Sequence, residues 1–389
     1  MELVKAVRLD TARAPRVQRD NVPMNNAFAL LALAASLLAL PAGAFKLQAF
    51  GFPQQAADGA NRQTQGFLQQ FRSDVHERIT ALAYEAAGVK LPADVVAGVR
   101  WNDNPPALRA GPLFGSCGGD ALQAGEGVMC WTGMLRVDRI ALEALTQRER
   151  SLAPVRSHFG DMQFLHAMAG RAGESPQETR ANVTRWSEFA YRVARGEIEP
   201  KARVSTLAKG KLLDEDTAQW LGTLFRGASK RHWTVQDVFL AKASSVRAIA
   251  FGSLLHLVED SYSAAHVRRA TSRVQANGCL SYGANDAIAQ FQTYVGQDTK
   301  KHGACDNAPD WLESPRPGSP VEVLSLLVRA YGDGRDWPYV RVLLEQQVFR
   351  LGEAVPAAAP GDCFEWRLTE STITPTSPAS GPGCRSDAP

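Results

Sequence analysis

The spacing of apolar residues is helical over most of the chain. A helix should begin at Ser73, its N-cap, and end at Gly88, because Val75, Ile79 and Leu82 recur every three or four residues. The same periodicity predicts helices at about 136–150, 176–197, 213–227, 234–260, 285–301, 320–332 and 337–352. Alternating patterns of the kind that strands produce are nearly absent, so the sequence predicts an all-α fold.

The first 44 residues have the pattern of a signal peptide. An Ala/Leu-rich run over 28–40 follows several arginines and precedes Ala-Gly-Ala at 42–44, a typical cleavage site. Met24 is an alternative start, and a retained membrane anchor is the alternative interpretation. The run is shorter than the roughly 20 apolar residues that a membrane-spanning helix needs. We therefore expect a secreted or periplasmic protein whose mature chain begins at Phe45.

The helical patterns after the signal peptide fit one large domain with additions. We place this domain at 45–355, with loop-like or polar insertions near 104–135 and 198–233. Residues 356–389 are rich in Thr, Ser, Pro and Gly and predict an irregular tail that a disulfide pins in place.

The cysteines and the net charge limit which metal ligands and which kinds of substrate are expected. Six cysteines in an exported chain predict three disulfides, and we favour the local pairs Cys117–Cys130, Cys279–Cys305 and Cys363–Cys384 among fifteen connectivities. No Cys-x-x-Cys pair occurs, so a metal site would use His and carboxylates.

Without residues 1–44 the chain has 38 basic and 37 acidic residues. That balance lacks the basic excess typical of nucleic-acid-binding proteins.

The end of the predicted helix 234–260 carries metal-binding side chains. His256 and Asp260 are four residues apart, so both project from one face of a helix and can bind one cation. His266 follows closely enough to bind a neighbouring metal. An ordinary His–Asp ion pair with a second His on a loop is the alternative interpretation.

His302 and Asp306 repeat the four-residue spacing. His302 continues the apolar face of Ile288 and Phe291, which predicts that it points into the core. A core His satisfied at a helix end is the alternative, and Asp298 is a competing ligand.

The pattern His256-x-x-x-Asp260-x-x-x-x-x-His266 after an apolar helix resembles the metal centre of the zinc-dependent phospholipase C and single-strand nuclease superfamily. That family usually has Pro four residues after the Asp, where this chain has Ala264. The resemblance extends over roughly residues 45–350.

Three upstream residues match the same family in the same order. His158 lies in a Ser-His-Phe-x-Asp segment that resembles the one supplying another zinc-binding His. Asp103 resembles the upstream Asp that acts there as general base, and His76 resembles the early-helix His of the third zinc site. A turn-forming Asp before prolines and a surface His are the alternative interpretations.

The resemblance implies a multi-helix phospholipase C-like fold with two or three zinc ions. The implied ligands are His158, His256 and Asp260 for one zinc; His266, His302 and Asp306 for a second; and the Phe45 amine, His76 and Asp260 again for a third. Glu259 is interpreted as a helix-surface residue, with support of a zinc ligand as the alternative. His166 is interpreted as a packed helix His and His232 as a solvated one.

The resemblance implies a secreted zinc-dependent phosphodiesterase that hydrolyses phospholipid head-group phosphodiesters with a metal-activated water. We expect a monomer that contacts membranes peripherally. A nuclease of the same fold is the alternative, and Asp306 supports it because the nucleases typically have Asp where the bacterial phospholipases have Glu. A non-catalytic secreted helical binding protein is the third hypothesis, and it predicts no bound zinc.

Overall fold

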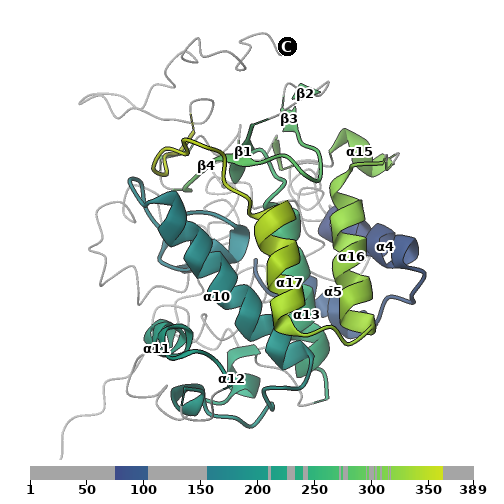
Figure 1. Cartoon of the computed structure of the whole chain (residues 1–389), viewed down its shortest axis with the longest axis vertical. Helices are drawn as coiled ribbons and strands as arrows, with labels where there is room; N and C mark the ends of the chain where they lie inside the picture. The colour runs from purple at the N-terminus through teal and green to yellow at the C-terminus, as the bar shows by residue number, and fades with distance from the viewer. Residues whose placement is uncertain are drawn as a thin grey trace, which may run out of the picture. The chain divides into compact units, whose positions relative to one another are not determined.

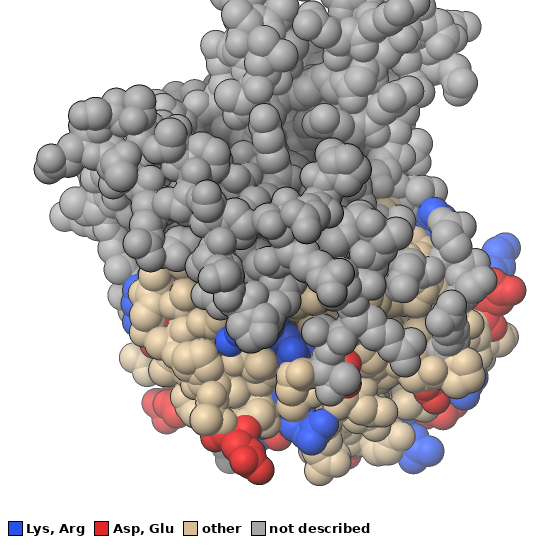
Figure 2. All heavy atoms as spheres, turned by 90° about the horizontal axis from the view of Figure 1, so that it is seen from above, with Lys and Arg blue, Asp and Glu red and all other residues tan. Residues whose placement is uncertain are grey.

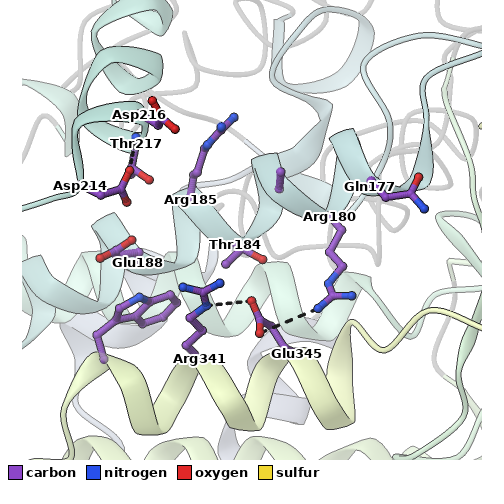
Figure 3. Close-up of a pocket in the computed structure, with 12 residues that line it drawn as sticks. Gln177, Arg180, Thr184, Arg185, Glu188, Asp214, Asp216, Thr217, Arg341 and Glu345 are labelled. Atoms are coloured by element: carbon purple, nitrogen blue, oxygen red, sulfur yellow. Dashed lines mark hydrogen bonds and ion pairs between the residues drawn. The ribbon is translucent and has the colours of Figure 1, made fainter.

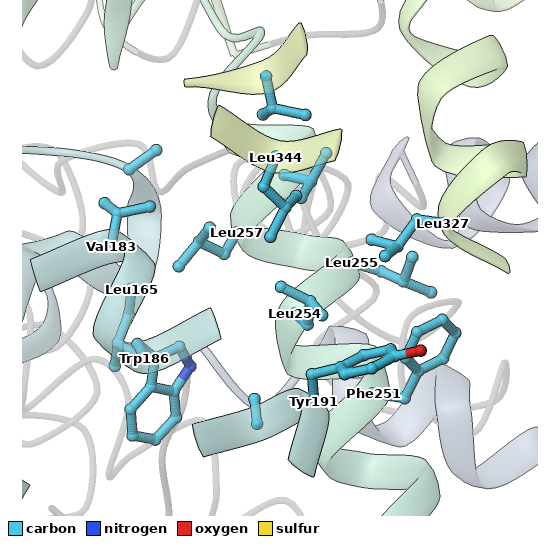
Figure 4. Close-up of a cluster of buried hydrophobic side chains, with 14 of the residues drawn as sticks. Leu165, Val183, Trp186, Tyr191, Phe251, Leu254, Leu255, Leu257, Leu327 and Leu344 are labelled. Carbon is cyan, nitrogen blue, oxygen red and sulfur yellow. The ribbon is translucent and has the colours of Figure 1, made fainter. Parts of the chain in front are cut away.

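The central element is helix α13, Val246–Asp260, which the apolar run predicted. Every residue from Ala250 to Asp260 is buried. A helix that is covered on all sides belongs in the core of a protein. It contacts five other helices: α4 (Val75–Ala87), α5 (Ala93–Val99), α10 (Pro176–Ala194), α12 (Val235–Phe239) and α16 (Pro320–Gly332). Figure 4 shows Leu254, Leu255 and Leu257 projecting from α13 in different directions into the apolar cluster.

The computed structural model describes residues 75–103, 156–208, 212–225, 233–239, 244–270, 273–274, 279–294, 296–297, 302, 305–306, 309–313, 315 and 317–361. These all lie in one compact unit, Leu40–Pro389. No helix in the described ranges is both long enough and apolar enough to cross a membrane.

Described helices lie within the predicted ranges 73–88, 176–197, 213–227, 320–332 and 337–352, and the predicted helix 234–260 contains two described helices, Val235–Phe239 and Val246–Asp260 (Figure 1). The predicted helix 136–150 lies outside the described residues. The longer helices are α4 Val75–Ala87, α10 Pro176–Ala194, α11 Glu215–Leu224, α13 and α16 Pro320–Gly332. The shorter ones are α5 Ala93–Val99, α9 Arg156–Phe159, α12 Val235–Phe239, α15 Asp310–Glu313 and α17 Trp337–Leu343. Single turns of other helix types are η4 Gln163–His166, η5 Val204–Thr206 and η7 Leu344–Val348.

Local signals explain several of the boundaries. Helix α4 ends before Gly88, whose φ of 74° is left-handed, as the sequence predicted. Helix α10 begins with Pro176 after Ser175, whose side chain accepts a hydrogen bond from the Glu178 amide. The predicted cap Ser73 lies outside the described residues.

The expectation of an all-α fold is correct only in its main feature. The described chain is mainly helical, but it also contains two small antiparallel sheets of two strands each. In one, β1 Val267–Arg269 pairs with β4 Ile288–Phe291; in the other, β2 Arg273–Val274 pairs with β3 Leu280–Ser281. Strands of two to four residues are too short to produce an alternating pattern.

The predicted helix 285–301 is wrong. Ile288 and Phe291 are both buried, but they lie on strand β4 and not on one face of a helix. Phe291 pairs with Val267 and Ile288 with Arg269, so a partner distant in sequence satisfies their backbone groups. Their three-residue spacing imitated helical periodicity by coincidence.

One predicted disulfide lies within the described residues and is confirmed. Cys279 and Cys305 are bonded, with their Cα atoms 5.2 Å apart. The bond ties the start of β3 to the turn that carries Asp306. The predicted pairs Cys117–Cys130 and Cys363–Cys384 lie outside the described residues, as do the predicted signal peptide and residues 362–389 of the predicted tail.

Candidate metal centre

Six histidines and three aspartates meet beside the end of α13. They come from six separate parts of the chain: α4, the turn after α5, α9, η4, α13 with the turn that follows it, and a helical turn at 302–306. All are buried: His76, Asp103, His158, His166, His256, Asp260, His266, His302 and Asp306. The structure therefore brings together every predicted site residue that it describes.

Asp260 is at the centre of this cluster. Its Oδ2 lies 2.7 Å from His166 Nδ1 and 2.9 Å from His256 Nε2. Its Oδ1 lies 3.3 Å from His76 Nε2 and 3.4 Å from His266 Nδ1. The predicted pairing of His256 with Asp260 across one helical turn is confirmed, and three further imidazoles surround the same carboxylate.

Three groups of side chains could each hold a cation. Their ligand atoms lie within 4.8 Å of one another in His76/His256/Asp260, in Asp103/His166/His256 and in His266/His302/Asp306. Two ligands of one zinc ion can be no more than about 4.2 Å apart, twice the usual bond length. The distances from Asp103 Oδ1 to His166 and His256, 3.8 and 3.9 Å, satisfy that limit.

The grouping agrees with part of the implied ligand sets. His266, His302 and Asp306 form one group, as the family resemblance implied. The Asp306 amide donates to the His302 carbonyl over 2.9 Å, so the pair does share one helical turn. His158 is 3.8 Å from Asp103, but His166 takes the place beside His256 that was expected for His158.

Outer partners fix the orientation of several rings. Glu259 Oε2 lies 2.6 Å from His76 Nδ1, and Gln297 Oε1 lies 2.6 Å from His302 Nδ1. Ser157 Oγ is 3.0 Å from His158 Nδ1. In each case Nδ1 is occupied from outside, so Nε2 is the nitrogen available to a metal. Metal-binding histidines are usually held this way.

Several buried polar atoms of the cluster have no hydrogen-bond partner within the part of the chain that the structure describes. Both carboxylate oxygens of Asp103 and both ring nitrogens of His266 are among them. A buried polar group without a partner costs about 1–3 kcal/mol, and more when it is charged. A cation bound between these atoms would satisfy them, so the residues present fit the implied metal.

The charge of the cluster also fits a cation. Four buried carboxylates meet here, those of Asp103, Glu259, Asp260 and Asp306, and within the described residues none forms an ion pair with Lys or Arg. With neutral imidazoles their summed charge is −4, which two divalent cations would balance. Buried charge is tolerated when it is paired in this way.

Protons compensate part of this charge when no metal is bound. Burial alone would lower the pKa of His76, but Asp260 and the hydrogen bond with Glu259 raise it well above the ordinary 6.5. Burial likewise opposes protonation of His266, and Asp260 and Asp306 raise its pKa. Burial lowers the pKa of His166 to about 4, despite its hydrogen bond to Asp260.

Zinc uptake by the metal-free protein should therefore release protons. Because the pKa values of His76 and His266 are raised, both rings hold protons above pH 6.5 that a metal must displace. At pH values below the raised pKa of a ring, each proton that zinc must displace lowers the apparent zinc affinity about tenfold for every unit by which the pH falls. Titration calorimetry in buffers of different ionisation enthalpy would count the released protons. A zinc affinity that does not change between pH 6.5 and pH 8 would contradict the prediction.

His166, a member of the cluster, and Glu259, an outer partner of it, were not predicted from the sequence to take part in the site. His166, set aside as a packed helix residue, is buried as expected but bonds directly to Asp260. Glu259 was interpreted as a surface residue, yet it is 1% exposed and contacts His76. Phe45, His232 and the competing ligand Asp298 lie outside the described residues.

A separate groove of about 440 Å³ lies between α10, α11 and α17 (Figure 3). It shares no residue with the cluster. Arg341 donates to Glu345 over 2.8 Å, and Arg180 lies 3.9 Å from the same carboxylate. Glu345 thus pairs with two of the arginines that line the groove.

Comparison of the chain with protein-family models, curated proteins and solved structures found no match. The family resemblance thus depends on the sequence motifs alone.

Proposed function

We propose that this protein is a secreted zinc-dependent phosphodiesterase of the phospholipase C type. The observation that carries the proposal is the carboxylate of Asp260, which lies within 3.4 Å of ring nitrogens from four buried histidines. A carboxylate with both oxygens directed at such a set is suited to bridge two cations. Imidazole and carboxylate donors without thiolates suit zinc.

The zinc ions, when bound, would neutralise a phosphodiester and make a water molecule acidic enough to attack it at neutral pH. His76, His158 and His302 hold fixed positions because the Nδ1 atom of each is already bonded from outside the cluster. Burial keeps competing water away and strengthens the electrostatic interactions within the site.

Asp103 is the candidate proton acceptor. Its Oδ1 lies 3.8 Å from His158 Nε2 and 3.9 Å from His256 Nε2, and neither of its oxygens forms a hydrogen bond with another described residue. Burial raises its pKa well above 3.8 in the metal-free protein, and the neighbouring carboxylates Asp260 and Asp306 raise it further. Nearby cations would favour the ionised form, which can accept a proton from water.

Charge favours a lipid substrate over a nucleic acid. The face of the molecule in Figure 2 intermixes basic and acidic side chains over its described part, without a continuous basic surface. Proteins that follow a phosphate backbone usually present such a surface. The second candidate function, a single-strand nuclease, is supported by Asp306, which takes the position where that branch typically has Asp.

Metal analysis with parallel assays tests the proposal. We expect two or three zinc ions per chain in the mature protein, hydrolysis of phosphatidylcholine, and loss of hydrolysis after chelation that added zinc restores. Hydrolysis of single-stranded DNA alone would support the nuclease instead. A chain that binds no zinc would contradict both and leave the non-catalytic binding protein.

A further inference from the structure

Glu259 is a buried carboxylate with two specific partners on another helix. Its Oε2 lies 2.6 Å from His76 Nδ1, and Thr80 Oγ1 donates to its Oε1 over 2.6 Å. His76 and Thr80 are four residues apart on α4, so both reach α13 from one face. All three side chains are at most 1% exposed.

Helix packing alone does not account for this carboxylate. Moving a carboxylate out of water is costly, and an apolar residue would fill the interface between α4 and α13 without that cost. Among the described residues Glu259 has no Lys or Arg partner. Its charge is therefore placed specifically against an imidazole.

The contact determines which nitrogen of His76 faces the cluster. With Nδ1 directed at Glu259, Nε2 points towards Asp260 Oδ1, 3.3 Å away. The ring also stacks on His256, with the centroids 4.0 Å apart and the planes at 22°. His76 is thus held in position from three sides.

We propose that Glu259 is a positioning residue that keeps the proton of His76 on Nδ1 and reserves Nε2 for a divalent cation shared with His256 and Asp260. The hydrogen bond from Thr80 fixes the carboxylate in turn. This inference rests on the proposed zinc-dependent function and names the residue that sets the affinity of one of its sites. A carboxylate behind a ligating histidine makes the ring a stronger donor.

The test is zinc and cobalt titration of the metal-free protein carrying Glu259→Gln. Glutamine preserves the shape and can still accept the Nδ1 proton, but it lacks the charge. We expect the affinity of one site to fall about 10–100-fold, the usual effect of losing such an outer partner. The other sites should keep their affinities, and the cobalt absorption of one site should change.

Two further variants separate positioning from folding. Thr80→Val removes the bond that orients Glu259 and should weaken the same site by a smaller factor. Glu85→Gln, an exposed change on the same helix, should leave every affinity unchanged. Equal affinities at all sites in Glu259→Gln and the unmodified protein would overturn the inference. Absence of phosphodiesterase activity in a protein with these affinities would overturn only the proposed function.

Discussion

Replacing Asp260 with Asn should remove the bound metal and the phosphodiesterase activity while the fold persists. The Asp260 carboxylate lies closest to the imidazoles of His166 and His256, and its other oxygen faces His76 and His266. Asn has nearly the same shape but no negative charge, and only one of its two terminal atoms can bind a cation. The loss of zinc affinity should exceed the roughly 100-fold upper effect of removing an outer partner.

Zinc per chain and turnover, measured on the same preparations, would check this expectation. Asp333→Asn is the matched control, because Asp333 is an exposed residue at the end of α16. It should retain full zinc content and turnover. Normal turnover at unchanged zinc content in Asp260→Asn would refute the central role of Asp260.

Helical spacing correctly predicted which candidate ligands face each other where two of them share one helical turn. His256 and Asp260, like His302 and Asp306, are four residues apart, and both pairs face each other in the structure. The predicted pairing of His302 with Asp306 is correct, although the helix predicted before it is a strand. A single turn needs only its own backbone hydrogen bond, so the error at residues 285–301 did not displace it.

Glu259 was misinterpreted although the sequence contained a usable signal. The residues from Ala250 to Val258 are almost all apolar, so this part of the helix leaves no face for water. A charged residue at its end must then be buried with a partner. The sequence could not identify that partner, because His76 is 183 residues away.

His166 could not have been placed from its spacing. It lies eight residues after His158, a separation of about 12 Å along a continuous helix, which is too far for the two rings to meet. The chain instead passes from α9 into the η4 turn, followed by Ala167 in the left-handed region at φ 54°. This change of direction brings the two rings within 4.6 Å of each other, and no local periodicity predicts it.

Replacing Gly252 with Ala should destabilise the whole protein, because α13 and α5 approach each other through glycines. A Cβ at Gly252 would overlap the carbonyl oxygen of Val95, and one at Gly98 would overlap that of Ile249. Both obstructing atoms belong to the backbone, so the helices would have to separate. Forcing additional methylene groups into a packed core typically costs about 1–3 kcal/mol.

The same separation should disturb the candidate metal centre. Helix α5 leads directly into Asp103, and Asn102 anchors that turn by donating to the backbone carbonyls of Ser253 and Leu165 over 3.0 and 2.7 Å. Ser253 also donates from its side chain to Asn102. Moving α13 away from α5 would break these bonds and withdraw Asp103 from His256, so turnover should fall together with stability.

Denaturant unfolding of the metal-free protein separates this effect from metal loss. Gly252→Ala should lower the unfolding free energy by at least about 1–3 kcal/mol, since backbone atoms cannot move aside as a flexible side chain would. Gly222→Ala is the matched control within helix α11, where an added Cβ has no atom within 4 Å. There alanine should stabilise by up to about 1 kcal/mol through its higher helix propensity. Equal stability of Gly252→Ala and the unmodified protein would mean that α5 and α13 can separate at no cost, and the anchoring of Asp103 through Asn102 would then need another explanation.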